Sequence, residues 1–176
     1  MTRIAVIGIG NVLTGDDAVG PTVVRLLEAQ YEVPAGVQVY DAGTPGLDLT
    51  AYLAGLHAVI LVDSVRAKGA PGELRLYSKE QLLKKAPVQA VSPHEPGVRE
   101  ALLHADFQGV APAVARLVGV IPAGTETGIG LSDPVRAALP AAVEAVVVEL
   151  QKLGAPPRRR EPPGAPDLWW EKKPGA

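Results

Sequence analysis

The sequence contains no cysteine, and this absence excludes several classes of chemistry at once. Disulfide bonds, thiolate nucleophiles and cysteine-ligated zinc or iron–sulfur sites cannot form in this chain. Any metal contact must therefore come from Asp, Glu or His side chains. Aromatic residues make up only 4% of the 176 residues, so the core must be built mainly from Val, Leu, Ile and Ala.

The sequence also lacks an excess of charge and any long apolar run. With 17 basic and 19 acidic residues the net charge is −2, which gives no electrostatic attraction for nucleic acid or an anionic membrane. The apolar run Ile4–Ile7 is too short for a signal-peptide core or a bilayer span. We therefore expect a cytoplasmic protein without nucleic-acid partners or membrane insertion. We also expect a monomer, because the predicted core leaves no extended apolar repeat uncovered.

Apolar runs typical of strands alternate with amphipathic stretches typical of helices along the chain, and this alternation predicts an α/β fold. The segment Glu73–Tyr77 follows the preceding strand too closely for a helical crossover, so we expect it to be an antiparallel edge strand. We predict a single-domain three-layer sandwich: a twisted, mostly parallel sheet of about five strands with helices on both faces. It resembles the phosphorylase/hydrolase-like architecture, with flavodoxin-like strand order at the switch point. The expected parallel strands are Ile4–Ile7, Val37–Tyr40, Ala58–Val62 and Leu117–Ile121.

Helical periodicity follows three of these strands, and a further helix is expected after Pro96. Thr44-Pro45 is typical of a cap before the helix Leu47–Leu53, and Pro140 is expected to break or kink the beginning of the last helix. We assign residues 1–153 to the domain. Residues 154–176 are rich in Pro and Arg, which favours a loosely ordered tail; a docking segment is the alternative.

Three polar residues stand at the predicted ends of strands or before a helix: Asp17, Asp63 and His94. In a flavodoxin-like sheet the first and third strands are neighbours, and ligands bind in the crevice at their carboxyl ends. Two carboxylates that close repel each other unless a proton or a cation lies between them. Two oxygens and one imidazole nitrogen suit nickel or zinc. Taken singly, these residues are compatible with a helix cap, a turn and an ordinary loop; their joint placement favours a site.

The remaining candidates have simpler interpretations. His57 and His104 are expected to be structural or surface residues. Asp16 is expected either to support the residues that contact the metal or to face solvent, and not to be a ligand itself. Gly8-x-Gly10 with Asp41 is compatible with dinucleotide binding, but Leu13 replaces the third glycine of that motif and the following acids would repel a pyrophosphate. Residues 41–44 (DAGT) resemble an aspartic-protease loop, although a dyad would need a second copy or a symmetric dimer.

Residues 8–20 (GIGNVLTGDDAVG) resemble the N-terminal signature of the hydrogenase maturation endopeptidases. The similarity continues through residues 41–44, 62–64 (VDS), 92–94 (SPH) and 119–122 (GVIP), and covers about residues 3–153. In the loop 41–44, Ala42 replaces a glycine that is common in the family.

This resemblance implies an endopeptidase that acts on the precursor of a nickel–iron hydrogenase large subunit. It implies that Asp17, Asp63 and His94 contact nickel carried by the substrate, with no organic cofactor. It also implies removal of a short C-terminal peptide after a basic residue, and Asn11, Asp41, Gly43 and Thr44 are expected to line the groove for that peptide. A module that senses the loaded precursor without cutting it, or a peptidase for another metalloprotein or small spore proteins, is the alternative.

Overall fold

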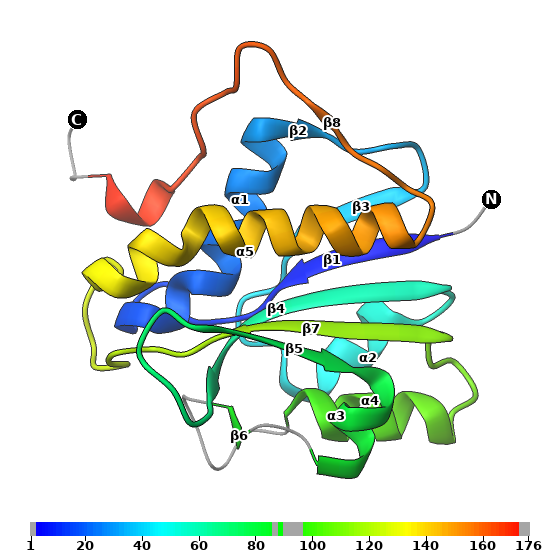
Figure 1. The fold of residues 1–176 in the computed structure, drawn as a ribbon. Helices are drawn as coiled ribbons and strands as arrows, with labels where there is room; N and C mark the ends of the chain where they lie inside the picture. The colour runs from blue at the N-terminus through cyan, green and yellow to red at the C-terminus, as the bar shows by residue number, and fades with distance from the viewer. Residues whose placement is uncertain (1–2, 86–87, 90–96, 173–176) are drawn as a thin grey trace.

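A five-stranded sheet forms the centre of the computed structural model, which describes residues 3–85, 88–89 and 97–172. The strands lie in the order β3-β1-β4-β7-β5 (Figure 1). The first four of these are parallel, and β5 pairs with β7 in the antiparallel direction at the edge. Both the mostly parallel sheet and the antiparallel edge strand are therefore confirmed. The strands are β1 (Ile4–Gly8), β3 (Val37–Asp41), β4 (Ala58–Arg66), β5 (Leu74–Ser78) and β7 (Val114–Val120).

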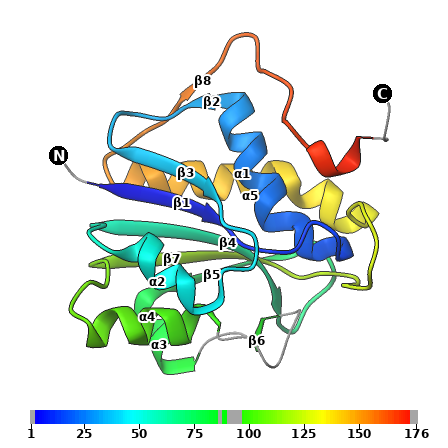
Figure 2. The ribbon, with the colours of Figure 1, turned by 180° about the vertical axis from the view of Figure 1, so that it is seen from behind.

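Helices cover both faces of the sheet, as the three-layer prediction requires (Figures 1 and 2). Side chains of β4 alternate between the two layers: Ile60 and Val62 join one buried cluster, whereas Val59 and Leu61 join the other. Burial on both faces explains why this strand is continuously apolar at its start. One face carries α1 (Val19–Gln30) and α5 (Asp133–Lys152), and the other carries α2 (Leu49–Leu53), α3 (Lys79–Lys85) and α4 (Val98–Phe107).

The strand β4 is longer than the apolar run predicted, so Asp63 lies inside the strand and not at its end. Its pairing with β7 continues to Ser64 opposite Val120, and a short strand, β6 (Val88–Gln89), pairs with Val65 and Arg66. The neighbouring strand β1 stops at Gly8, opposite Val62. Asp63 is thus the first residue of β4 beyond the end of β1.

Two helix starts also differ from the expectation. A 3₁₀ helix, η2 (Gly46–Asp48), precedes α2, and its N-cap residue is Pro45 with no side-chain hydrogen bond, so the predicted Thr44 cap is wrong. The helix α5 begins at Asp133 and continues through Pro140. Pro140 costs this helix one backbone hydrogen bond. The buried row that includes Leu139, Val143 and Val146 offsets that loss.

The described part of the C-terminal tail, residues 154–172, runs back over the domain along α5 (Figure 1). Its strand β8 (Arg158–Arg159) pairs with β2 (Tyr31–Glu32), and it ends in a 3₁₀ helix, η3 (Trp169–Glu171). Trp170 is only 4% exposed. These contacts show where the tail lies. The prediction that the tail is loosely ordered concerns its mobility and stays a prediction.

Among the described segments, no helix has both the length and the apolar character needed to cross a membrane.

Candidate active site

Glycines allow the loop after β1 to fold back across the ends of β1 and β4. A Cβ atom on Gly20 would lie 2.2 Å from the Ile9 carbonyl oxygen and 2.4 Å from that of Val62. Gly10 has a φ of +145°, and a Cβ there would lie 1.9 Å from the Asp17 carbonyl oxygen. The glycines of this segment therefore serve close backbone packing, which accounts for Gly8-x-Gly10 without a dinucleotide.

Asp17 lies in a 3₁₀ helix, η1 (Gly15–Ala18), at the crevice between β1 and β4. Its carboxylate is buried and accepts hydrogen bonds from the Asn11 backbone N–H (2.6 Å) and the Ser64 hydroxyl (2.8 Å). The helix α1 that follows has no side-chain cap. Asp17 is thus turned toward the crevice rather than toward the first turn of α1.

Asp63 is buried in β4 and precedes Ser64, whose hydroxyl binds Asp17. Strand alternation turns its side chain to the face that α4 covers. His94 lies outside the described residues, and within these residues no group of three His, Cys, Asp or Glu side chains is arranged to hold a metal ion. The convergence of Asp17, Asp63 and His94 on one cation stays a prediction.

Of the two roles predicted for Asp16, the structure excludes the solvent-facing one. It is 1% exposed, so the expectation that it faces solvent is wrong. Its carboxylate accepts hydrogen bonds from the backbone N–H groups of Ala123 (2.8 Å), Gly124 (3.3 Å) and Ser132 (2.7 Å), and from the Ser132 hydroxyl (2.8 Å). Asp16 therefore ties the loop before α1 to the loop between β7 and α5.

The four predicted substrate-binding residues, Asn11, Asp41, Gly43 and Thr44, line one groove of about 390 Å³. The Gly43 N–H donates to the Asp41 carboxylate (3.1 Å), and the Gly10 N–H donates to the Gly43 carbonyl (2.8 Å). These bonds join the loop after β3 to the loop after β1. The groove is completed by Gly10, Val12, Ala42 and, from the tail, Trp169.

Ala42 fits the backbone of this loop. The left-handed position belongs to its neighbour Gly43, with a φ of +59°, and no described residue other than glycine has a positive φ. The backbone at position 42 therefore accepts a side chain.

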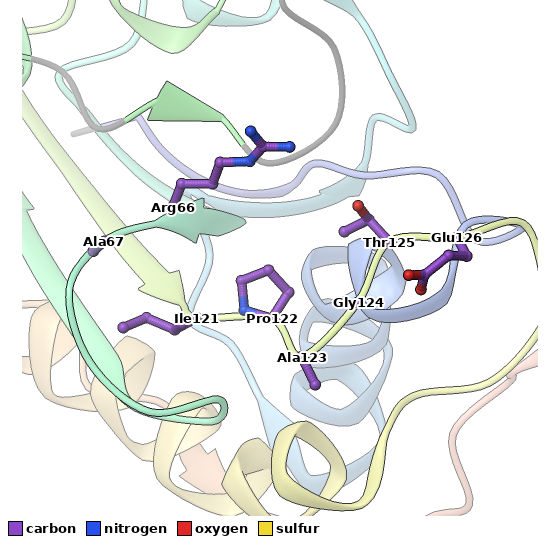
Figure 3. A pocket seen from close by; sticks show the side chains of 8 residues that line it. All are labelled: Arg66, Ala67, Ile121, Pro122, Ala123, Gly124, Thr125 and Glu126. Carbon is purple, nitrogen blue, oxygen red and sulfur yellow. The ribbon is translucent and has the colours of Figure 1, made fainter.

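A second pocket, of about 320 Å³, lies at the ends of β4 and β7. Figure 3 shows Arg66 on one side of it and Thr125 and Glu126 on the other. Its wall includes Ala123 and Gly124, the residues that donate to Asp16. The acidic pair thus stands between the groove and this pocket.

The two other histidines lie on the surface. His57 is exposed before β4, and the exposed His104 ring lies 3.3 Å from the Thr50 hydroxyl and 3.2 Å from the Gln108 amide. Sequence reasoning missed a different residue, Trp169. The only signal for it was a Trp-Trp pair in a chain with 2 tryptophans.

Comparisons with known proteins agree with this geometry. The HycI family model, described as hydrogenase maturation protease, matches residues 21–149. The chain is similar to the hydrogenase 2 maturation protease of Escherichia coli K12, with 36% identity over 90% of this chain and 97% of that protein. It is also similar to the hydrogenase expression/formation protein HupD of Rhizobium leguminosarum bv. viciae, with 34% identity over 86% of this chain and 76% of that protein.

Solved structures show the same relationship. The hydrogenase maturating endopeptidase HybD of E. coli superimposes with a TM-score of 0.83 at 34% identity, over 92% of this chain and 99% of that one. A hydrogenase 2 maturation peptidase from a thaumarchaeote gives a TM-score of 0.65 at 35% identity, over 87% of this chain and 99% of that one. By sequence, fold and the placement of its loops, this chain belongs to the hydrogenase maturation protease family and is an endopeptidase.

Proposed function

We propose that this endopeptidase removes the C-terminal extension of a nickel–iron hydrogenase large-subunit precursor after nickel has been inserted. In this proposal Asp17, Asp63 and His94 contact the nickel that the substrate carries. The observation that carries the proposal is the burial of two carboxylates at the crevice between β1 and β4, with exposures of 2% for Asp17 and 3% for Asp63.

Buried carboxylates favour a cation as partner, because burial disfavours the charged form of each carboxyl group. The Asp17 carboxylate accepts hydrogen bonds from the Asn11 N–H and the Ser64 hydroxyl, which fix its direction. Carboxylate oxygens are ligands for divalent metals. A precursor without nickel brings no cation to this site, so we expect it to bind weakly.

The groove lined by Asn11, Asp41, Gly43 and Thr44 would hold the peptide that is cleaved. It opens beside Asp17, because the Asn11 N–H binds that carboxylate while the residue also lines the groove. A peptide in the groove would thus pass close to the metal-contacting side chains. A bound divalent ion polarises a neighbouring carbonyl or activates a water molecule.

The proposal is tested by incubating nickel-loaded precursor with the parent protein and with Asp17→Ala, Asp63→Ala and His94→Ala variants. Mass spectrometry of the precursor reports whether it is shortened and at which bond. We expect the parent to shorten it and each variant to lose at least about a hundredfold in kcat/KM, the scale of losing a metal contact or its support. Precursor prepared without nickel should stay uncut.

Matched controls come from exposed residues of the same types. Asp106→Ala removes an exposed carboxylate on α4, and His57→Ala an exposed imidazole; both variants should cut like the parent. Undiminished processing by all three site variants would refute the assignment of these residues. An uncut precursor with the parent protein would refute the proposed substrate.

The wider assignment includes an aspartic-type classification, a cytoplasmic location, a monomeric state and the lack of an organic cofactor. These four points stay predictions.

A further inference from the structure

We infer that the C-terminal tail is part of the substrate site and that Trp169 binds an apolar side chain of the peptide that is cleaved. This inference rests on the proposed function of the groove. Its starting point is the lining of the groove, where Trp169 joins residues of the loops after β1 and β3 from a position more than a hundred residues further along the chain. The family model matches only residues 21–149, so the tail lies outside it.

The two adjacent tryptophans are placed in opposite ways. Trp170 is 4% exposed, whereas Trp169 is 55% exposed. Their rings meet edge to face at 88°, with centroids 5.6 Å apart. Trp170 therefore anchors η3 to the domain and supports the neighbouring indole, while Trp169 offers a large apolar surface at the groove. An aromatic side chain held in this way is a favourable contact for a ligand because little entropy is lost when it binds.

Several contacts along the tail hold η3 in position. The Gly164 N–H donates to the Ala29 carbonyl (2.8 Å), and the Arg160 N–H donates to the Gln30 carbonyl (2.8 Å) at the end of α1. Near η3 itself, Glu171 pairs with Arg136 at the start of α5 (3.1 Å). The position of Trp169 is thus fixed by both helices that cover this face of the sheet (Figure 2).

Two ion pairs also help to hold the tail in position. The Arg158 guanidinium lowers the pKa of the Glu32 carboxyl by hydrogen bonding to it, and the Lys172 ammonium does the same to the pKa of Asp167. Both pairs are exposed, so they are weak individually. They join β8 to β2 and close the turn around η3.

The groove selects a particular kind of ligand. The described residues that line it include Gly10 and Gly43, which have no side chain, and one carboxylate, Asp41, which lies 3.8 Å from the Arg25 guanidinium. Because the Arg25 guanidinium already offsets the charge of Asp41, this carboxylate attracts a basic group of a ligand less strongly. The largest apolar surface left is the Trp169 indole, so the expected ligand is an extended peptide with an apolar side chain stacked on Trp169.

The test compares steady-state cleavage of nickel-loaded precursor by the parent, Trp169→Ala and Trp169→Phe proteins. We expect Trp169→Ala to raise KM about tenfold with kcat changed less than about twofold, because the contact is made equally in ground and transition states. Trp169→Phe should recover most of the loss. Phe107→Ala, which removes an aromatic residue that is 91% exposed on α4, should match the parent.

A second measurement separates a substrate contact from a structural role. Each apolar residue of the extension is replaced by Ala in the precursor, and kcat/KM is measured with the parent and with Trp169→Ala. One replacement should weaken cleavage by the parent but not by Trp169→Ala, which is the coupling expected of a direct contact. Thermal unfolding of Trp169→Ala should shift by no more than the few °C expected from losing the contact with Trp170.

The outcomes distinguish this inference from the proposed function. If the parent cuts and Trp169→Ala has the same or a lower KM, the inference is wrong and the proposed function stands. If no precursor replacement couples to Trp169, the inference is also wrong. If the parent binds the precursor in calorimetry without cutting it, the proposed function fails, and an unchanged Kd for Trp169→Ala would then refute the inference. If the parent neither binds nor cuts, both fail.

Discussion

Replacing Asp16 with Ala should destabilise the protein strongly, although the next residue, Asp17, is the one proposed to act on substrate. The Asp16 carboxylate accepts from three backbone N–H groups and one hydroxyl of residues 123–132. Ser132 is the N-cap residue of α5 and makes no side-chain cap bond of its own. The start of α5 therefore depends on Asp16.

The size of the effect follows from these contacts. Three of the four bonds are 2.7 to 2.8 Å long, and a hydrogen bond to a charged group contributes about 1.5 to 3 kcal/mol. At the lower end, the three together contribute about 4.5 kcal/mol to the free energy of unfolding. For a chain of this size each kcal/mol shifts Tm by roughly 2–4 °C. Asp16→Ala should therefore lower Tm by about 10 °C.

Urea unfolding followed by circular dichroism measures the free energy, and calorimetry measures Tm. Asp16→Asn keeps one acceptor oxygen and should lose about half as much as Asp16→Ala. Glu144→Ala, an exposed acid on α5, should stay within about 0.5 kcal/mol of the parent. A Tm for Asp16→Ala within about 2 °C of the parent would refute the reasoning, because it would mean that residues 123–132 do not depend on this carboxylate.

Two further substitutions test the packing of the helices. Gly20→Ala should lower the free energy of unfolding by about 3 kcal/mol in urea, since its Cβ would meet the Ile9 and Val62 carbonyl oxygens at 2.2 and 2.4 Å; an unchanged midpoint would contradict the close contact. Pro140→Ala should raise the free energy of unfolding by about 2 kcal/mol. A proline inside a helix destabilises the folded state by about 3 kcal/mol, but it also restricts the unfolded chain, which stabilises the protein by about 1 kcal/mol. A lower stability for that variant would show that the proline suits the backbone of α5.

The sequence was sufficient for the layers of the fold because burial leaves a clear pattern. The first five residues of β4, Ala58–Val62, are covered on both faces and are continuously apolar, whereas the edge segment Glu73–Leu76 alternates polar and apolar residues. The same pattern could not show where β4 ends. Ser64 and Arg66 are polar, yet they remain in the strand because β7 and β6 supply pairing partners there. Hydrogen bonds to a distant segment have no signature in local hydropathy.

The candidate site was predictable to the extent that it lies in short motifs. Asn11 and residues 41–44 come from two loops that the sheet order brings together, and they line one groove; that this groove holds the peptide stays a prediction. The missing parts are contacts across long separations. Asp16 binds residues more than 100 positions away, and Trp169 reaches the groove only because the tail returns along α5. Neither fact can be read from composition or periodicity.

The adjacent acids Asp16 and Asp17 take different roles because of the backbone between them. Both lie in η1, and a 3₁₀ helix turns by about 120° per residue, since it has about three residues per turn. Consecutive side chains therefore cannot face the same surroundings. Asp16 accepts hydrogen bonds from the loop before α5, and Asp17 accepts one from Ser64 in β4. An Asp-Asp pair in this loop thus supplies one carboxylate that fixes the pocket wall and one that faces the crevice, and exchanging their roles would require a different helix register.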